Sequence, residues 1–336
     1  SDNGLLLDVR GLEICYGVKK VLQDVDLQVR RGAAVGVIGE SGSGKTTLAQ
    51  AIAGLAEPTA GRILLDGQPH SKTLAGRTRE QFRRIQFVFQ NADTALNPRH
   101  SIEDILGRPL RFYHGMKGAQ RQRRVAELLE LVQLPASIAQ RRPGELSGGQ
   151  KQRVNLARAL AAEPDLILCD EVTSALDPVV GAAIPELLRD LRRALGVSYL
   201  FISHDISTVR ALCDDIVVMY SGHKVEAGDC ESFVQVPFHP YTDLLINSVP
   251  ELRQGWLEGC NASHGDLPPI NAVDTTAHLC PFLNRCPVRI DGLCNRSAPP
   301  RRNIAGGSEV LCHHESAELL KAQQGSTSLK RVGTYA

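Results

Sequence analysis

The sequence predicts an α/β fold, and three observations indicate it. A glycine-rich loop, residues 39–46, fits the P-loop pattern of Gly, four residues and Gly-Lys-Thr. Its context is the expected one, because the apolar run 33–38 is typical of a buried strand and residues 45–55 favour a helix. A second apolar run, 166–171, ends in two carboxylates, where an α/β sheet places its ligand site. These features predict a sheet with a phosphate-binding edge.

The chemistry of the glycine-rich loop points to a nucleotide triphosphate. Glycines let successive backbone N–H groups turn toward phosphates, and the following helix presents its positive end. Lys45 is expected to reach the β- and γ-phosphates, and the Thr46 hydroxyl to hold Mg²⁺. A plain Gly/Ser turn is the alternative, which the lysine and threonine disfavour. The predicted nucleotide-binding residues of the loop are Gly39, Ser41, Gly42, Ser43, Gly44, Lys45, Thr46 and Thr47.

Composition and charge set limits on the class of protein. A chain of 336 residues with 43% hydrophobic content can build one large or two modest domains. No run approaches the ~18 apolar residues of a membrane helix, and no export signal is visible at the beginning. Lys and Arg number 38 against 37 Asp and Glu, which gives no overall attraction for nucleic acid. We therefore expect a globular protein with no nucleic acid partner.

Hydrophobic periodicity places the elements of the first half. Residues 5–30 alternate between apolar and polar types and predict antiparallel strands, with Tyr16 in the turn between them. Residues 61–66 and 85–90 predict further strands, and residues 91–145 form a helical insert. The aromatic ring of Tyr16 either caps the small sheet or stacks on a nucleotide base, and spacing alone does not decide between the two.

The second half begins with a helix start that suits phosphate binding. Leu146 is followed by Ser147, Gly148, Gly149 and Gln150, a serine cap that opens a helix to about residue 162. Seen alone, this segment is an ordinary helix start, but beside a P-loop it is a second phosphate-binding helix start.

Two strand ends carry the candidate catalytic groups. At the end of run 166–171, Asp170 suits a Mg²⁺ ligand and Glu171 a base that polarises water, an account that we favour over a solvated edge. Residues 198–202 predict another strand, which ends next to His204. A lone histidine is usually structural, but its position at the same sheet edge favours a contact with the γ-phosphate. Helix 179–195 precedes this strand, and short strands 215–219 and 224–226 close the sheet.

This ordered set of motifs resembles the ATP-binding subunit of an ABC transporter, over about residues 5–250. The family's fold is a mixed central sheet with an antiparallel β subdomain and a helical subdomain. The resemblance implies that Tyr16 stacks on adenine, that residues 39–47 are the Walker A loop, and that residues 146–150 are the signature sequence. It implies that Gln90 links Mg²⁺ and the attacking water to the transmembrane partner. It also implies that Asp170 is the Walker B aspartate, Glu171 the catalytic glutamate and His204 the switch histidine, with the D-loop at 174–177.

Two further segments resemble the oligopeptide, dipeptide and nickel importer branch. They are residues 95–99, after Gln90, and residues 238–242 with Leu244 and Leu245. Residues 91–93 depart from the Asp-Pro that usually follows the glutamine, which weakens any assignment of a particular substrate. The branch implies an ATPase for uptake of peptides or a related small solute.

The partners and location also follow from the resemblance. In this family each ATP lies between Walker A of one subunit and the Ser147–Gly149 segment of another, so a second ATPase subunit, identical or not, is implied. Two transmembrane permease subunits and an extracytoplasmic substrate-binding protein complete such importers. Residues 97–111 are our candidate surface for a permease coupling helix. The expected location is peripheral, on the cytoplasmic face of the inner membrane.

The composition changes after residue 250, where long apolar runs become scarce. We predict a nucleotide-binding domain at 1–250, a regulatory or metal-binding module at 251–322 and a disordered tail at 323–336. Four cysteines of the module, Cys280, Cys286, Cys294 and Cys312, suit either zinc or a [4Fe–4S] cluster, and His313 or His314 is able to replace a ligand. The importer branch favours the cluster, since tails of some members bind one; zinc, or free or disulfide-linked cysteines, are the alternatives.

Two other functional classes belong to the wider ABC group. A DNA-repair or chromosome ATPase predicts long coiled-coil heptads or zinc modules between Walker A and the signature, together with a basic DNA track. An ABC protein acting on ribosomes predicts two ATPase halves and a basic linker. The short insert, the balanced charge and the single P-loop favour the importer ATPase.

Overall fold

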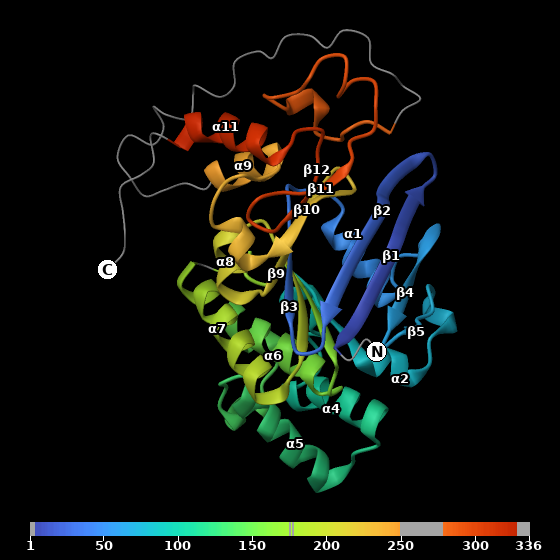
Figure 1. Ribbon diagram of the computed structural model, residues 1–336. Coiled ribbons are helices and arrows are strands. Elements are labelled where there is room, and N and C mark those ends of the chain that lie inside the picture. Colours follow the sequence, from blue (N-terminus) through green and yellow to red (C-terminus); the bar gives the residue numbers. More distant parts are fainter. Residues whose placement is uncertain (1–3, 175, 177, 249–277, 328–336) are drawn as a thin grey trace. The chain divides into compact units, whose positions relative to one another are not determined.

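The computed structural model describes residues 4–174, 176, 178–248 and 278–327 (Figure 1). These residues belong to two compact units. The first contains residues 1–38 and 45–214, and the second contains residues 39–44 and 215–336. The division at 214/215 differs from the domain boundary predicted near residue 250, because the strands that follow residue 214 pack with the C-terminal segments.

The first unit begins with an antiparallel sheet of four strands in the order β2-β1-β4-β5. Its strands are β1 (Leu5–Tyr16), β2 (Lys19–Arg30), β4 (Ala60–Leu65) and β5 (Gln68–Pro69). The long hairpin of β1 and β2 pairs Leu7 with Val29 and Tyr16 with Lys19. Apolar residues such as Leu7 and Val29 are fully buried, so the prediction of antiparallel strands over residues 5–30 is confirmed.

The same unit contains four parallel strands in the order β3-β8-β7-β6. They are β3 (Ala34–Ile38), β6 (Ile85–Val88), β7 (Leu166–Asp170) and β8 (Ser198–Ser203). Every residue of β3, β7 and β8 is buried, as expected for a parallel sheet covered on both faces. Helix α1 (Lys45–Ala53) packs on β6, β7 and β8, and helix α8 (Ile206–Leu212) packs on β3 and β8. Gly36 permits that approach, since a Cβ there would lie 2.1 Å from Cγ1 of Val209.

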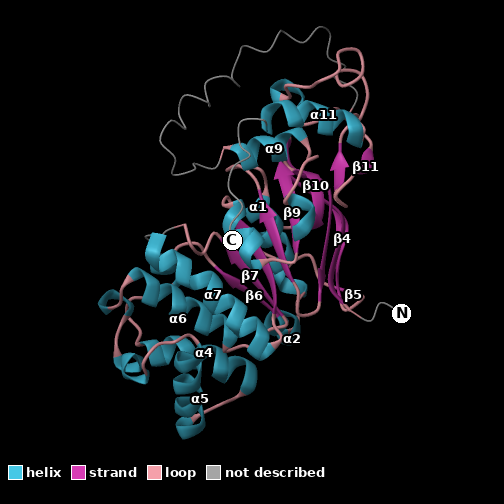
Figure 2. Cartoon of the chain, turned by 60° about the vertical axis from the view of Figure 1, so that its left-hand side comes forward, coloured by secondary structure: helices cyan, strands magenta, loops and turns pink. Residues whose placement is uncertain are grey.

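Helices dominate the chain between β6 and β7 (Figure 2). They are α3 (Ala92–Ala95), α4 (Ile102–His114), α5 (Gly118–Leu131) and α6 (Gly148–Leu160), while α2 (Arg79–Arg84) precedes β6 and α7 (Pro178–Leu195) follows β7. Ser101 caps the beginning of α4, and Gly115 ends it in the left-handed region with φ of 67°. The prediction of a helical subdomain is confirmed. Short 3₁₀ turns lie at Leu74–Gly76, Ala136–Gln140, Pro143–Glu145, Cys230–Phe233 and Leu283–Arg285.

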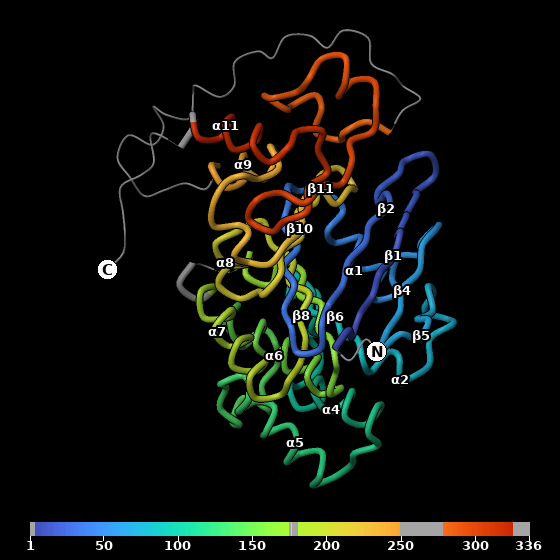
Figure 3. Tube along the Cα trace, in the orientation of Figure 1, coloured from blue at the N-terminus to red at the C-terminus, as the bar shows by residue number. Residues whose placement is uncertain are grey.

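The second unit contains four antiparallel strands in the order β11-β12-β10-β9. They are β9 (Asp215–Tyr220), β10 (His223–Asp229), β11 (Arg301–Asn303) and β12 (Glu309–Leu311). Helices α9 (Pro240–Asn247) and α11 (Ser316–Thr327) lie side by side in the tube trace (Figure 3). Gln323 joins α11 to the segment just before α9, since its side-chain oxygen accepts from Phe238 N at 2.9 Å and its side-chain nitrogen donates to Phe238 O at 2.8 Å.

Helix α11 corrects one prediction about the tail. It continues to Thr327, so residues 323–327 are helical and the disorder predicted from residue 323 is wrong for them. A buried apolar cluster that includes Leu319 and Val310 anchors the helix. The remainder of the predicted tail, 328–336, lies outside the described residues. Among the helices that the structure describes, none combines the length and the apolar character needed to cross a bilayer.

Glu226 on β10 is a buried carboxyl in the second unit, with 1% of its surface exposed. Its oxygens accept hydrogen bonds from His239 N at 2.9 Å and from the Ser308 hydroxyl at 2.7 Å. Burial raises the pKa of Glu226 to about 7, Asp243 adds to the rise, and the hydrogen bonds from Thr242, Ser308 and His239 oppose it. The buried carboxyl therefore connects β10 to the residue before β12 and to the residue that caps α9.

We predict that Glu226→Gln changes how stability depends on pH. The pKa of Glu226 lies at about 7 in the folded state against 4.5 for the unfolded chain. As pH rises, the carboxyl therefore loses its proton at a lower pH in the unfolded state than in the folded state. The free energy of unfolding of the wild type falls as pH rises from 4.5 to 7, because the folded state keeps this carboxyl protonated. The free energy of unfolding of the variant, relative to wild type, should rise by up to roughly 3 kcal/mol across this window. Urea unfolding of the full chain at several pH values measures it, and a difference that stays constant with pH contradicts the prediction.

Candidate functional site

The carboxyl ends of the parallel strands gather the candidate catalytic residues at one edge of the sheet. Asp170, the last residue of β7, pairs with Ile202 of β8, and Val88 of β6 pairs with Cys169 of β7. Parallel strands end at the same edge, so the residues that follow them become neighbours. The edge therefore brings together side chains that lie far apart in the sequence, by 124 positions for Thr46 and Asp170.

Asp170 and Thr46 form the first contact at this edge. The Thr46 hydroxyl, in the first turn of α1, donates to Asp170 Oδ1 at 3.1 Å. Burial raises the pKa of Asp170, while the Thr46 hydrogen bond and the charge of Lys45 counteract the rise. A hydroxyl and a carboxylate at hydrogen-bond distance are the hard oxygen ligands that Mg²⁺ prefers. Two of the three residues predicted to hold Mg²⁺, Thr46 and Asp170, are thus in direct contact.

Glu171 is the centre of a second group of contacts. Its Oε2 accepts from Gln90 Nε2 at 3.2 Å, and its Oε1 lies 3.7 Å from Nδ1 of His204. Gln90 Nε2 also donates to the Ser174 hydroxyl at 2.9 Å, which in turn donates to the carbonyl of Glu171 at 2.9 Å. The structure thus joins Gln90, Glu171 and His204. Of the predicted D-loop, Ala175 and Asp177 lie outside the described residues.

Two residues that position Gln90 were missed by sequence reasoning. The carbonyl of Phe89, the residue before Gln90, accepts from Asn155 Nδ2 at 3.3 Å and from Gln152 Nε2 at 3.5 Å. Both side chains are buried, with 0% and 3% of their surfaces exposed. Polar residues on the buried face of a predicted helix were the available signal, because such groups need partners. Helix α6 therefore holds the segment that carries Gln90.

The glycine-rich loop belongs to the second unit up to Gly44, and α1 follows it directly in the chain. Gly39 has φ of 153°, and a Cβ there would lie 2.2 Å from the carbonyl oxygen of Met219, so only glycine fits. Gly222, in the turn between β9 and β10, donates its N–H to the carbonyl of Ser43 at 3.0 Å. Ser41 and Gly42 are exposed, whereas Ser43, Gly44 and Lys45 are buried. The loop is thus held by β9 and the turn after it, and its Ser41 and Gly42 face solvent.

Tyr16 and Ser147 are presented to solvent. Tyr16 ends β1 with 55% of its surface exposed, which leaves its ring open for stacking. Ser147 caps α6 in a capping box: its hydroxyl accepts from Gln150 N at 3.3 Å, and its own N–H donates to Gln150 Oε1 at 3.0 Å. Ser147 and Gly148 are exposed, so the beginning of α6 is accessible to a ligand or a second molecule.

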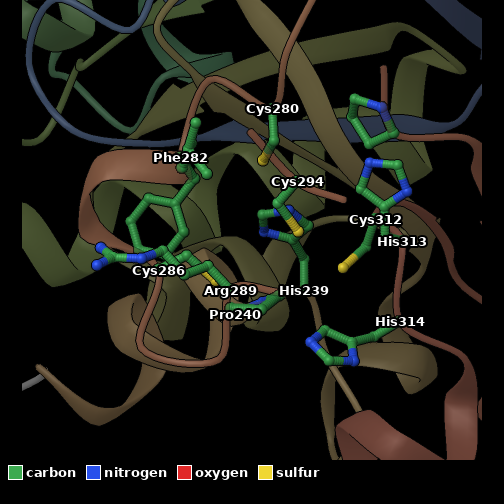
Figure 4. Close-up of a pocket in the computed structure, with 12 residues that line it drawn as sticks. His239, Pro240, Cys280, Phe282, Cys286, Arg289, Cys294, Cys312, His313 and His314 are labelled. Atoms are coloured by element: carbon green, nitrogen blue, oxygen red, sulfur yellow. The ribbon is translucent and has the colours of Figure 1, made fainter. Parts of the chain in front are cut away.

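The four cysteines of the C-terminal segment line a single pocket (Figure 4), with His239, His313 and His314 among its other lining residues. Every cysteine within the described residues is a free thiol. Burial raises the pKa of Cys280 and of Cys286 to about 12, so these thiols are protonated near neutral pH. Over the described ranges, no three Cys, His, Asp or Glu side chains converge closely enough to hold a metal ion. The pocket has the right donors without the convergence of a formed metal site.

Comparison with known proteins agrees with this geometry. Residues 22–174 match the family model described as ABC transporter, and residues 225–294 match the model described as oligopeptide/dipeptide transporter, C-terminal region. A relative from Brucella abortus, whose name describes a peptide import ATP-binding protein, is 42% identical over 88% of this chain and 87% of its own length. The chain belongs to the ABC transporter ATPase family. A similarly named protein of Brucella ovis is 39% identical over 91% of this chain and 97% of its own length.

Solved structures place the fold in the same family. The ATP-binding cassette MJ0796, in a dimeric post-hydrolysis state with ADP and Pi, superposes with a TM-score of 0.61 at 32% identity, covering 67% of this chain and 99% of that one. CbiO1 from Clostridium perfringens, part of the transporter complex cbiONQ, superposes with a TM-score of 0.62 at 28% identity, covering 68% and 90%. The predicted P-loop ATPase fold is confirmed, and the protein is an ATP-hydrolysing enzyme of the oligopeptide/dipeptide importer branch.

We predict that Glu171→Gln separates ATP binding from hydrolysis. The amide keeps the size of the side chain but accepts no proton from water, so steady-state phosphate release should fall about 10²- to 10⁴-fold. Binding of ATP by the full chain should change little, because the P-loop contacts are untouched. Phosphate release at the wild-type rate, by the ATPase with its partner subunits, would refute this role for Glu171.

Proposed function

We propose that this ATPase drives the uptake of peptides or a related small solute, by coupling ATP-dependent closure of two ATPase subunits to a membrane permease. The match to an oligopeptide/dipeptide transporter C-terminal region, in addition to the ATPase match, is the observation that carries the proposal. The relatives whose names describe peptide import support it. The chain itself supplies the ATP-driven part, and substrate selection belongs to the partners.

The roles of the edge residues follow from the chemistry of phosphoryl transfer. Mg²⁺, when bound, would neutralise the negative charge that develops during phosphoryl transfer. Thr46 and Asp170 would hold it, and Gln90 would contribute its amide oxygen, because its amide nitrogen already donates to Glu171 and Ser174. Glu171 would polarise the attacking water, and His204 would contact the γ-phosphate. Most of this catalysis is positioning and electrostatic stabilisation.

A second ATPase subunit would complete the nucleotide site. The exposed Ser147–Gly148 start of α6 offers N–H groups and a positive helix end to a phosphate, and the capping box keeps this start preformed. The γ-phosphate held by one subunit would bind this segment of the other. ATP would then favour the closed dimer, and hydrolysis with product release would reopen it. The relative MJ0796 was solved as a dimer, which supports this arrangement.

The permease would dock near Gln90. Asn97, Pro98 and Arg99 follow Gln90 in the chain and are exposed, and α4 begins shortly after them at Ile102. The segment 97–111 is therefore our proposed receiver of a coupling helix from a transmembrane permease. The ATPase would act peripherally, at the cytoplasmic face of the inner membrane, together with two permease subunits and an extracytoplasmic substrate-binding protein.

We also propose that the cysteine pocket holds a soft metal centre, a [4Fe–4S] cluster first and zinc second. Four thiols and three histidines on one pocket are a suitable donor set for either. The described side chains do not converge on a metal position, so binding would require them to move and the thiols to lose their protons. The centre would stabilise the C-terminal segments rather than transfer electrons.

Transport by the reconstituted importer tests the main proposal. Proteoliposomes that contain the permease and this ATPase, with the substrate-binding protein and ATP, should accumulate labelled oligopeptides. Ser147→Arg should abolish uptake and ATP-dependent dimerisation, because a bulky side chain would obstruct the phosphate of the partner. Lys151→Ala, one turn further along α6, is the matched control and should retain most uptake. ATP-dependent uptake of a different solute, with no response to peptides, would disprove the assigned substrate class.

Metal analysis of the full chain tests the second proposal. Protein purified without oxygen should contain about four irons and four sulfides per chain and absorb visible light, and Cys294→Ser should lose both. One zinc and no colour would establish the alternative. Protein that contains neither metal, purified without chelators, would show that the cysteines are simply free thiols.

A further inference from the structure

The phosphate-binding loop contains one acidic residue, Glu40, directly after Gly39. Such loops bind phosphates through N–H groups, a lysine and a positive helix end, so a carboxylate inside the loop opposes the binding of a triphosphate. Its negative charge weakens nucleotide affinity unless another group neutralises it.

Arg285 provides the neutralising charge. Its guanidinium forms two parallel hydrogen bonds with the Glu40 carboxylate, Nη1 to Oε2 at 2.8 Å and Nη2 to Oε1 at 2.9 Å. The two side chains are 43% and 41% exposed, so the pair acts mainly through its bidentate geometry and less through desolvation. The guanidinium also lies 5.7 Å from the ring centres of both Tyr220 and Phe282, which fixes its plane.

A second contact fixes the backbone of Glu40. The N–H of Glu40 donates to the Tyr241 hydroxyl at 2.7 Å, and Tyr241 is fully buried on α9. Its ring packs against Tyr220 at 4.6 Å and against Phe282 at 5.5 Å. One aromatic cluster therefore supports both the hydroxyl that holds the Glu40 backbone and the guanidinium that holds its carboxylate.

Arg285 itself is placed by the segment between two of the pocket cysteines. Leu283 N donates to the Cys280 carbonyl at 3.1 Å, and Arg285 N donates to the Phe282 carbonyl at 3.0 Å. These bonds form a short 3₁₀ turn that ends at Cys286. The conformation of the cysteine segment thus determines where the guanidinium lies, and Figure 4 shows Phe282 among the side chains that line the pocket with these cysteines.

We propose that Arg285 is a positioning residue for ATP binding, through which the Cys280–Cys286 segment neutralises Glu40 and holds the phosphate-binding loop ready for the nucleotide. This inference depends on the ATPase activity alone, and neither the peptide substrate nor a metal centre is needed for it. Arg285 touches neither the phosphates nor the attacking water. It changes the affinity for ATP through its effect on Glu40.

The test is a double-mutant cycle on Arg285 and Glu40, measured by steady-state hydrolysis in the intact transporter and by binding of a fluorescent ATP analogue to the full chain. Arg285→Gln should raise KM for ATP about three- to tenfold and leave kcat within about twofold, because it removes the guanidinium that offsets the Glu40 charge beside the phosphates. Adding Glu40→Gln removes that charge, so KM of the double variant should return to that of Glu40→Gln alone.

A matched control separates this role from a general loss of packing. Arg301→Gln removes another ion-paired arginine of the same unit, whose partner is Glu309, and should leave KM unchanged. Melting temperatures identify any variant that fails to fold. An increase in KM that persists in the Glu40→Gln background, or a fall in kcat that accompanies it, would show that Arg285 acts structurally and would overturn the proposal.

Discussion

The parallel pairing of β3, β8, β7 and β6 is the constraint on which the site depends. Because these strands run in one direction and are buried, their carboxyl ends coincide, and Asp170, Glu171 and His204 become neighbours. A shift of β7 by one residue would exchange the faces of its side chains and separate Asp170 from Thr46. Burial of the strands therefore fixes the position of the carboxylates as well as the stability of the sheet.

Much of this site could be predicted from the sequence, since the P-loop and the two acids at a strand end are local patterns with a known structural context. Helix and strand assignments between residues 5 and 226 agree with the structure to within a few residues. Contacts between distant residues could not be predicted in this way. The positions of Arg285 and Glu40 differ by 245, and no periodicity reports that a guanidinium reaches a particular carboxylate. The compact units divide at residue 214/215, whereas the composition changes near residue 250, because packing between distant segments leaves no mark on composition.

Glutamine and asparagine side chains have a larger part in this site than their number suggests. Gln152 and Asn155 hold the carbonyl of Phe89, and Gln90 then reaches both Glu171 and Ser174. Buried amides of this kind need partners with defined geometry, which restricts the segment to few conformations. The strand-end carboxylate of Glu171 is thereby joined to helix α6 through a short series of hydrogen bonds.

The hydrogen bond that caps α6 leaves the Ser147 hydroxyl able to donate to a ligand. The hydroxyl oxygen of Ser147 uses a lone pair to accept from Gln150 N, so its hydrogen remains available to an outside acceptor. Its rotamer is already restricted by the cap, and less side-chain entropy is lost when an anion arrives. The hydrogen bond at the beginning of α6 thus orients the Ser147 hydroxyl for an anion before the anion binds.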